Sequence, residues 1–316
     1  MKNSEYNVES IIENIENVVI GKRNEIKLLL TALLCNSHVL IEDVPGVGKT
    51  TIANALAKSI EGDFKRIQFT PDVMPSDITG FSMFNPKKNS FEYVEGAIMA
   101  NIILADEINR TPPKTQSSLM EVMSEKQVTV DGKAYKLPQP FMVIATQNPV
   151  EYLGTYPLPE AQIDRFIMKI SLGYPNANEE WAILTAYQKT NPLDTLQSVV
   201  SCEELIKMQK IVREDIEIEE SIYDYIIELV GKTRSHPYVQ LGASPRASLH
   251  LSLASRAMAF MNNRSYVLPD DVRSLAQNVL VHRLVLHQEA KLKKVTSEQI
   301  ISEIIKDTSL PVVKKR

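Results

Sequence analysis

Residues 43–51, DVPGVGKTT, form the most informative stretch of this sequence, and they lie between a predicted strand and a predicted helix. The run 38–41 before them is apolar, as in a buried strand, and apolar residues recur at helical spacing in 51–62. A glycine-containing loop that leads into a helix directs backbone N–H groups at an anion, and a lysine and a hydroxyl add contacts to phosphate and Mg²⁺. The residues that supply these groups are Gly46, Gly48, Lys49 and Thr50. The stretch therefore predicts a phosphate-binding loop.

The loop departs from the strict phosphate-binding pattern GxxxxGK[ST] at one position, because Asp43 stands where the pattern has glycine. A second interpretation is a glycine turn that begins the helix and leaves Lys49 solvated. The order of strand, loop and helix favours phosphate binding, since the context matches the pattern as well as the letters do.

A second motif at 102–110, IILADEINR, is an apolar strand that ends in Asp106 and Glu107. At the carboxyl edge of a sheet, Asp106 would hold Mg²⁺ through water, and Glu107 would orient or deprotonate a water nucleophile. An acid pair after an apolar run is also a common helix start, and the motif alone favours that interpretation. Its place after the phosphate loop in a sheet-forming chain reverses the preference.

A third motif at 143–149, VIATQNP, is a buried strand that delivers Thr146, Gln147 and Asn148 at its end. A neutral amide there can hydrogen-bond an attacking water or a phosphate without competing for the metal. The alternative is that Asn148 only forms a turn before the proline.

Two later segments, LPEAQIDRF and ASPRA, each contain one arginine, Arg165 and Arg246. Arg246 lies in the first turn of a predicted helix, where a positive charge is unfavourable, so we expect it to have another role. The alternative for Arg165 is a surface ion pair with Asp164 or Glu160, which would contribute less than about 1 kcal/mol.

The pattern along the whole chain predicts an α/β fold followed by a helical region. Short apolar runs separated by helical segments indicate a parallel sheet covered on both faces. Beyond the loop strand, the apolar runs are 100–104, 141–145 and 166–170, and the segment 66–69 is a further short strand candidate. After Tyr174 only helical patterns remain. We therefore expect a core over 1–190 and an all-helical region over 191–316.

The composition is that of an ordinary globular protein, with 316 residues, of which 44% are hydrophobic and 23% charged. The net charge of −4 gives no overall basic field, so nucleic acid is not an expected partner. There is no run of about 18 apolar residues and no apolar centre of a signal peptide, so we expect no membrane span and a cytoplasmic location. The five histidines show no spacing typical of a metal site.

These motifs together resemble those of an AAA+ ATPase, and specifically of the MoxR subfamily. The matching segments are IEDVPGVGKT, ITG, LADEINRTPPKTQ, VIATQNP, YPLPEAQIDRF and GASPRA. The resemblance extends from Val19 to about Asp307, nearly the whole chain. It implies a P-loop AAA+ core with a parallel sheet and β-hairpin inserts, followed by an all-helical lid domain.

The resemblance implies roles for the residues at the sheet edge. Lys49 and Thr50 correspond to the Walker A lysine and the magnesium-binding hydroxyl. Asp106 and Glu107 correspond to the Walker B pair, and Asn148 to sensor 1. The implied cofactors are ATP and Mg²⁺, with Thr50 and Asp106 as the metal ligands. The loop residues expected to contact the nucleotide are Pro45, Gly46, Val47, Gly48, Lys49, Thr50 and Thr51.

Further roles follow from the same resemblance. Arg165 resembles the arginine finger that reaches into a neighbouring subunit's site, and Arg246 resembles sensor 2 on the lid. The segment that lines the adenine pocket in this family matches Val19, Ile20 and Gly21.

Two expected hairpins interrupt the α/β pattern, at 81–94 and at 127–137, and the second contains the Asp-Gly turn typical of a hairpin. They resemble the helix 2 insert and the hairpin before sensor 1, which face the pore or the partner surface in related rings. The aromatic residues of the first hairpin would either grip a polypeptide or pack within the hairpin itself. They are Phe81, Phe84, Phe91 and Tyr93.

The resemblance implies a Mg²⁺-dependent ATPase that forms a homo-oligomer, a hexameric ring, and remodels or matures a partner protein complex. Its expected partner is a von Willebrand factor A domain protein. One alternative is a DNA-acting or chelatase-type ring motor, and the negative net charge argues against the DNA-acting form. Another is a nucleotide-gated scaffold with little turnover, and the complete set of site residues argues against it.

Overall fold

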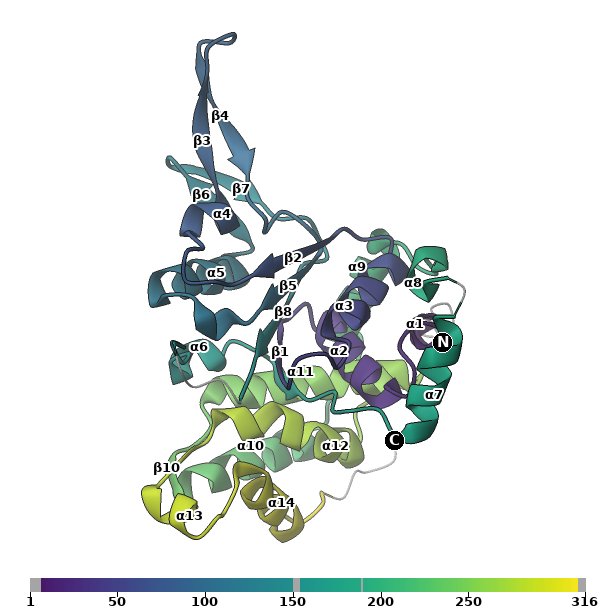
Figure 1. The fold of residues 1–316 in the computed structure, drawn as a ribbon. Coiled ribbons are helices and arrows are strands. Elements are labelled where there is room, and N and C mark those ends of the chain that lie inside the picture. Colours follow the sequence, from purple (N-terminus) through teal and green to yellow (C-terminus); the bar gives the residue numbers. More distant parts are fainter. Residues whose placement is uncertain (1–6, 150–153, 189, 312–316) are drawn as a thin grey trace.

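The computed structural model describes residues 7–149, 154–188 and 190–311. Its centre is a five-stranded sheet with the strand order β2-β5-β8-β1-β9 (Figure 1), in which every neighbouring pair is parallel. The strands are β1 (Val39–Glu42), β2 (Phe64–Gln68), β5 (Ile102–Asp106), β8 (Met142–Gln147) and β9 (Met168–Ile170). Each strand overlaps a run that the sequence predicts, so the expected α/β core with a parallel sheet is confirmed.

Both faces of the sheet are covered, as its apolar strands require. Successive residues of a strand point to opposite faces, so Ile103 and Leu104 of β5 belong to two different cores. One core lies under α5 (Pro113–Glu125). The helices over the other core are α1 (Val8–Glu16), α2 (Arg23–Leu34) and α3 (Lys49–Ser59). This second core also contains residues of the C-terminal helices, so it joins the sheet and the C-terminal region into one body.

The chain after β9 forms mostly helices, as the helical patterns after Tyr174 predict. They are α7 (Ala177–Ala186), α8 (Pro192–Thr195), α9 (Cys202–Glu214), α10 (Glu220–Ser235), α11 (Pro245–Met261), α12 (Pro269–Leu280), α13 (Gln288–Leu292) and α14 (Ser297–Asp307). The region also contains an antiparallel pair, β10 (Val239–Leu241) and β11 (Val285–Leu286), which the sequence analysis does not predict. Strands of two and three residues are too short to give an alternating pattern. The domain boundary between residues 190 and 191 stays a prediction.

Within the described part of the chain, no helix is both long and apolar enough to cross a membrane.

Both expected hairpins form, as β3 (Gly80–Asn85) with β4 (Ser90–Glu95) and β6 (Gln127–Val130) with β7 (Lys133–Lys136). The first extends away from the body of the molecule (Figure 1). The base of this hairpin packs against the β6–β7 hairpin, because the ring of Tyr93 stacks on that of Tyr135 with centroids 4.0 Å apart. Phe84 and Phe91 pack edge to face across the hairpin, yet 45% and 70% of their surfaces stay exposed.

His38, the residue before β1, joins three elements at the amino edge of the sheet. Its Nε2 lies 3.0 Å from the backbone oxygen of Met123, and its Nδ1 accepts the N–H of Val143 at 3.0 Å. Nδ1 can accept only when it carries no proton, so the ring is neutral. Burial lowers the pKa of His38 from its usual 6.5 to about 4.

We predict that His38 makes the stability of the fold depend on pH. Because the pKa of His38 is lower in the folded chain, the unfolded chain takes up the proton first, and stability is lost as pH falls from about 6.5 towards 4. His38→Gln should have a lower free energy of unfolding than the wild type at pH 7.5. This gap between the two free energies should be smaller by about 2 kcal/mol at pH 5. Urea unfolding at both pH values measures the gap, with the exposed His287→Gln as the control. An equal gap at both pH values would contradict the prediction.

Candidate active site

The candidate phosphate-binding loop lies between β1 and α3, as the sequence predicts. Gly46 and Gly48 have φ of +85° and +91°, a left-handed conformation that other residues rarely adopt. A Cβ at either glycine would meet nothing within 4 Å, so the space over the loop is open. Gly48 directly precedes α3, whose first turn has no side-chain cap. The N–H groups of this turn are therefore available to an anion over the loop.

Lys49 and Thr50 occupy the first turn of α3. Lys49 Nζ donates a hydrogen bond of 2.9 Å to the backbone oxygen of Asp43, which closes the loop. Thr50 is exposed beside it. Pro45 is also exposed, while Val47 packs against the core of the sheet.

Asp43, the departure from the strict pattern, anchors the loop. Its Oδ2 accepts the N–H groups of Leu172 and Gly173 at 2.6 and 2.8 Å and the hydroxyl of Ser171 at 3.0 Å. Its Oδ1 accepts the N–H of Val44 at 2.9 Å. The buried carboxylate thus ties the start of the loop to the segment that follows β9. A glycine at this position would leave those donors without their acceptor.

A cavity of about 180 Å³ lies beside the loop. Six residues that the sequence predicts to contact the nucleotide line this cavity: Val19, Ile20, Gly46, Val47, Gly48 and Thr51. Pro175, Ile183 and Tyr187, from α7 and its flanks, also line it and are not predicted by the sequence analysis. Gly21 does not line the cavity. It has a φ of +76°, and a Cβ there would stand 2.3 Å from a side-chain carbon of Glu179, so it lets α7 approach closely.

Asp106 and Glu107 lie at the carboxyl end of β5. Asp106 Oδ1 accepts the hydroxyl of Thr146 at 2.6 Å, and the same hydroxyl oxygen accepts the N–H of Glu107 at 2.9 Å. Glu107 has a φ of +58°, a conformation that costs energy for a residue with a side chain. Thr146 therefore holds both acids in place.

Two partners of these acids come from β2 and are not predicted by the sequence analysis. Arg66 Nη2 lies 2.6 Å from Asp106 Oδ2, and Gln68 Nε2 donates to Glu107 Oε2 at 2.9 Å. The alternation of the strand puts Arg66 and Gln68 on one face, but the sequence does not reveal that β2 pairs with β5.

Asn148 is buried just after β8, the strand between β5 and β1. The backbone N–H of Asp43 donates to the oxygen of Gln147 at 3.2 Å, so the ends of β1 and β8 are directly joined. Asn148 therefore lies between the loop and the two acids, as expected for parallel neighbours.

The donor set at this edge fits a nucleotide and Mg²⁺. Among the described residues, no group of three or more His, Cys, Asp or Glu side chains could hold a metal ion by itself. Mg²⁺ at phosphates needs only one or two protein oxygens, because water and phosphate fill its other positions. Thr50 and Asp106 supply two. The carboxylate of Asp106 has about four acceptor positions, and its three bonds to Arg66 and Thr146 leave one open.

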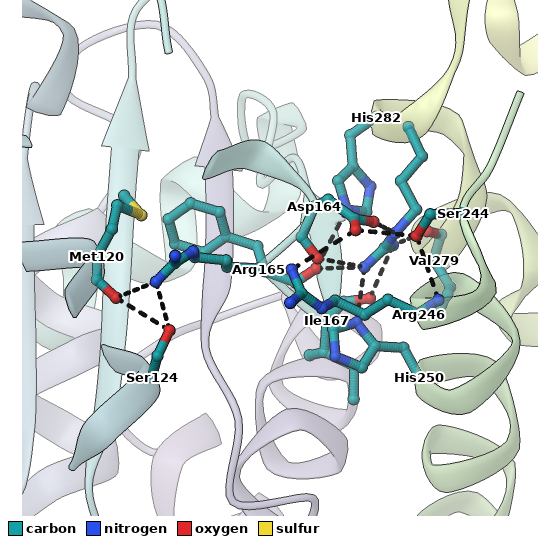
Figure 2. Close-up of polar contacts among 12 residues, drawn as sticks. Met120, Ser124, Asp164, Arg165, Ile167, Ser244, Arg246, His250, Val279 and His282 are labelled. Carbon is teal, nitrogen blue, oxygen red and sulfur yellow. Dashed lines mark hydrogen bonds and ion pairs between the residues drawn. The ribbon is translucent and has the colours of Figure 1, made fainter. Parts of the chain in front are cut away.

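Arg165 and Arg246 do not line the cavity beside the loop. Figure 2 shows Arg165 directed at α5, where it donates to the backbone oxygen of Met120 at 2.6 Å and to the hydroxyl of Ser124. Arg246 Nη1 lies 3.6 Å from Asp164 Oδ2. Both arginines line a second cleft of about 180 Å³. The surface ion pair considered for Arg165 is therefore not what the structure shows.

This second cleft lies at the opposite edge of the sheet. Arg165 precedes β9 and His38 precedes β1, and the backbone N–H of Ile167 donates to the oxygen of His38 at 2.9 Å. The phosphate-binding loop follows β1 instead, so the length of β1, roughly 10–13 Å, separates the two places. Within one chain, the structure does not bring Arg165 or Arg246 to Lys49.

Arg283, which the sequence analysis does not predict, joins the lid to the segment that carries Arg165. Only 1% of its side chain is exposed, and it donates to Asp164 Oδ1 at 2.8 Å and to the oxygen of Phe166 at 2.6 Å. Its Nη2 also lies 2.6 Å from His250 Nδ1. Burial, together with Arg283, lowers the pKa of His250 to about 3, so His250 is neutral and accepts this bond.

Comparison with known proteins shows the family of this chain. The model of the ATPase family associated with various cellular activities (AAA) matches residues 38–168, and that of the AAA lid domain matches residues 231–304. Chaperone MoxR1 of Mycobacterium tuberculosis is 39% identical over 98% of this chain and 83% of its own length. Protein YeaC of Bacillus subtilis is 54% identical over 95% of this chain and 94% of its own. The crystal structure of a candidate ATPase from Cytophaga hutchinsonii has a TM-score of 0.91 at 41% identity, with 98% of each chain covered.

A parallel sheet with a P-loop and a helical lid defines the class of AAA ATPases. The chain belongs to the MoxR family within that class.

We predict that Asp43 contributes to the stability of the fold. Asp43→Ala leaves the buried N–H of Leu172 and the partly buried N–H of Gly173 without an acceptor, and we expect a loss of about 1–3 kcal/mol in the free energy of unfolding. Urea denaturation without nucleotide measures it. The exposed Asp224→Ala on α10 serves as the control and should change the value by less than about 0.5 kcal/mol. Equal effects of the two substitutions would contradict an anchoring role.

Proposed function

We propose that this chain hydrolyses ATP with Mg²⁺ in a homo-oligomeric, hexameric ring and uses the energy to remodel a partner protein. One observation carries the proposal. The loop and the acids lie at one edge of the sheet, and Arg165 and Arg246 lie at the other. A site with all of these groups needs two subunits, with the loop edge of one against the arginine edge of the next.

At the loop edge, the N–H groups at the start of α3 and the ammonium of Lys49 bind the phosphates. Thr50 and Asp106 would hold Mg²⁺, which when bound neutralises charge on the phosphates. Glu107 orients the attacking water. In the structure its carboxylate is bonded to Gln68 and lies 3.3 Å from Arg110 Nε, so it must exchange these contacts to do so. Asn148 donates to the water or the phosphate.

At the arginine edge, Arg165 neutralises the charge that develops on the transferred phosphoryl group of the neighbour. Arg246 adds a second positive charge from the lid. Its 3.6 Å contact with Asp164 is long, and 48% of its side chain is exposed, which supports its availability to a second subunit. The bonds of Arg283 to Asp164 and to the oxygen of Phe166 keep the two arginines in a fixed relation.

The hairpin β3–β4 is the proposed contact with the remodelled protein. It extends from the body, and Met83 and Phe91 on it are 56% and 70% exposed. Large exposed apolar side chains on a projecting element are typical of a protein-binding surface. The resemblance to MoxR proteins suggests a von Willebrand factor A domain protein as the partner.

We predict that Lys49→Ala loses ATP binding, because the ammonium contacts the phosphates directly. Glu107→Gln should keep ATP binding and lose turnover by on the order of 10²-fold or more, because Glu107 acts only on the water. Calorimetric titration with ATP and phosphate release measure the two properties, with the exposed Glu298→Gln as the control. If Glu107→Gln hydrolysed ATP at the wild-type rate, the assignment of Glu107 as the residue that orients the water would be wrong.

We predict that Arg165→Ala binds ATP but hydrolyses it about 10³-fold or more slowly. Mixing it with Lys49→Ala should restore activity, because the intact Arg165 of one subunit then faces the intact loop of the next. Phosphate release in mixed samples tests this, with the exposed Arg273→Ala as the control for loss of a surface charge. If Arg165→Ala hydrolysed ATP, and if the specific activity of the wild type stayed constant on dilution, the protein would be a monomeric ATPase and the proposed ring would be wrong.

A further inference from the structure

The helix α7 carries an apolar surface that the chain itself does not cover. None of its ten residues is buried, and Trp181 and Leu184, one helical turn apart, are 69% and 67% exposed. Its Ile183 helps to line the cavity beside the phosphate-binding loop. The helix also contains two acidic residues, Glu179 and Glu180, and no basic residue. It lies at the outer edge of the molecule (Figure 1).

A groove of about 700 Å³ has the complementary character. It lies where the end of α2 meets α9, α10 and α11. Its apolar lining includes Ile206, Tyr223 and Leu249, and Leu249 is 71% exposed. The charged residues of the lining are Lys126, Lys210, Arg213, Glu214 and Arg256, four basic and one acidic. The groove is therefore apolar with a basic rim.

The wall of the groove is preformed. Arg256 Nη1 donates to the backbone oxygen of Arg213 at 2.5 Å, and its Nη2 donates to the hydroxyl of Tyr223 at 3.1 Å. These bonds connect α11 to α9 and α10 across the groove. A partner that enters would not have to order the wall first, which lowers the cost of binding.

The groove is continuous with the cleft that holds the two arginines. Asn36 and Lys126 line both. In the same way, α7 adjoins the cavity beside the phosphate-binding loop through Ile183 and Tyr187. Each of the two surfaces thus borders one half of the divided site.

We propose that α7 of one subunit docks into this groove of a second copy of the chain. The inference rests on the proposed function and names the contact that would complete its site. With α7 in the groove, the loop of one subunit comes next to Arg165 and Arg246 of the other. The acidic helix and the basic rim attract each other, whereas two α7 helices would repel. The contact joins two different surfaces, and such a contact closes into a ring when the rotation between subunits allows.

Site-directed cross-linking tests the docking directly. Trp181→Cys and Leu249→Cys are introduced into separate chains, both with Cys35→Ala and Cys202→Ala. A mixture of the two chains, treated with ATP, Mg²⁺ and a short bis-maleimide, should give a cross-linked dimer. Either chain alone should give none. The control mixture contains Leu292→Cys in place of Leu249→Cys. Leu292 lies on α13, is 84% exposed and does not line the groove. Cross-linking equal to this control would overturn the proposal.

Assembly measured by sedimentation, in chains with both native cysteines, gives a second readout. Trp181→Ser should raise the concentration needed for assembly by at least about tenfold, as for a central apolar contact, and Leu292→Ser should not. Glu180→Lys and Arg213→Glu should each weaken assembly, and their combination should recover part of it. Calorimetric ATP binding should persist in Trp181→Ser, because Trp181 does not line the cavity. Unchanged assembly of Trp181→Ser would overturn the proposal.

The failure of this docking is distinguishable from failure of the proposed function. If Arg165→Ala and Lys49→Ala complement each other but Trp181 and Leu249 do not cross-link, the ring stands and α7 docks elsewhere. If a fluorescent DNA duplex binds the chain and Arg213→Glu with Arg256→Glu abolishes this binding, the groove is a nucleic-acid surface. That result would overturn the docking of α7.

Discussion

The parallel pairing of β5, β8, β1 and β9 controls where the phosphate-binding loop, the two acids, Asn148 and Arg165 lie. Parallel strands all end at one edge, so the loop after β1, the acids after β5 and Asn148 after β8 meet there. The same pairing puts the residues that precede strands, such as His38 and Arg165, at the other edge. One chain therefore holds the two parts of its site apart, and the proposed ring follows from that separation.

Buried polar bonds fix each edge. At the loop edge, the carboxylate of Asp43 accepts the N–H groups of Leu172 and Gly173, which joins the loop to the chain after β9. At the other edge, the guanidinium of Arg283 binds Asp164, which joins the lid to the segment of Arg165. Both groups are buried and hydrogen-bonded, so removing one partner leaves the other unsatisfied and costs more than the bond itself contributes.

Much of the fold and of the loop edge could be predicted from the sequence, because each part is a local signal. Gly46, Gly48 and Lys49 lie within a few residues of one another, and apolar runs mark the strands of the sheet other than β2, in which Arg66 and Gln68 flank Ile67. The contacts that the sequence does not predict join segments that are distant along the chain. Arg66 reaches Asp106 only because β2 pairs with β5, and Ile183 reaches the cavity only because α7 returns to the loop.

The sequence by its local patterns determined the α/β core and the helical lid and predicted the phosphate-binding loop and the acid pair, because hydrophobic period and turn chemistry are properties of neighbouring residues. It left open what Asp43 does and whether Arg165 forms a surface ion pair. Tertiary structure answered both, since the partners of these side chains, Leu172 for Asp43 and Met120 for Arg165, lie far away along the chain. Burial and hydrogen-bond satisfaction are properties of the packed molecule, and no stretch of sequence contains them.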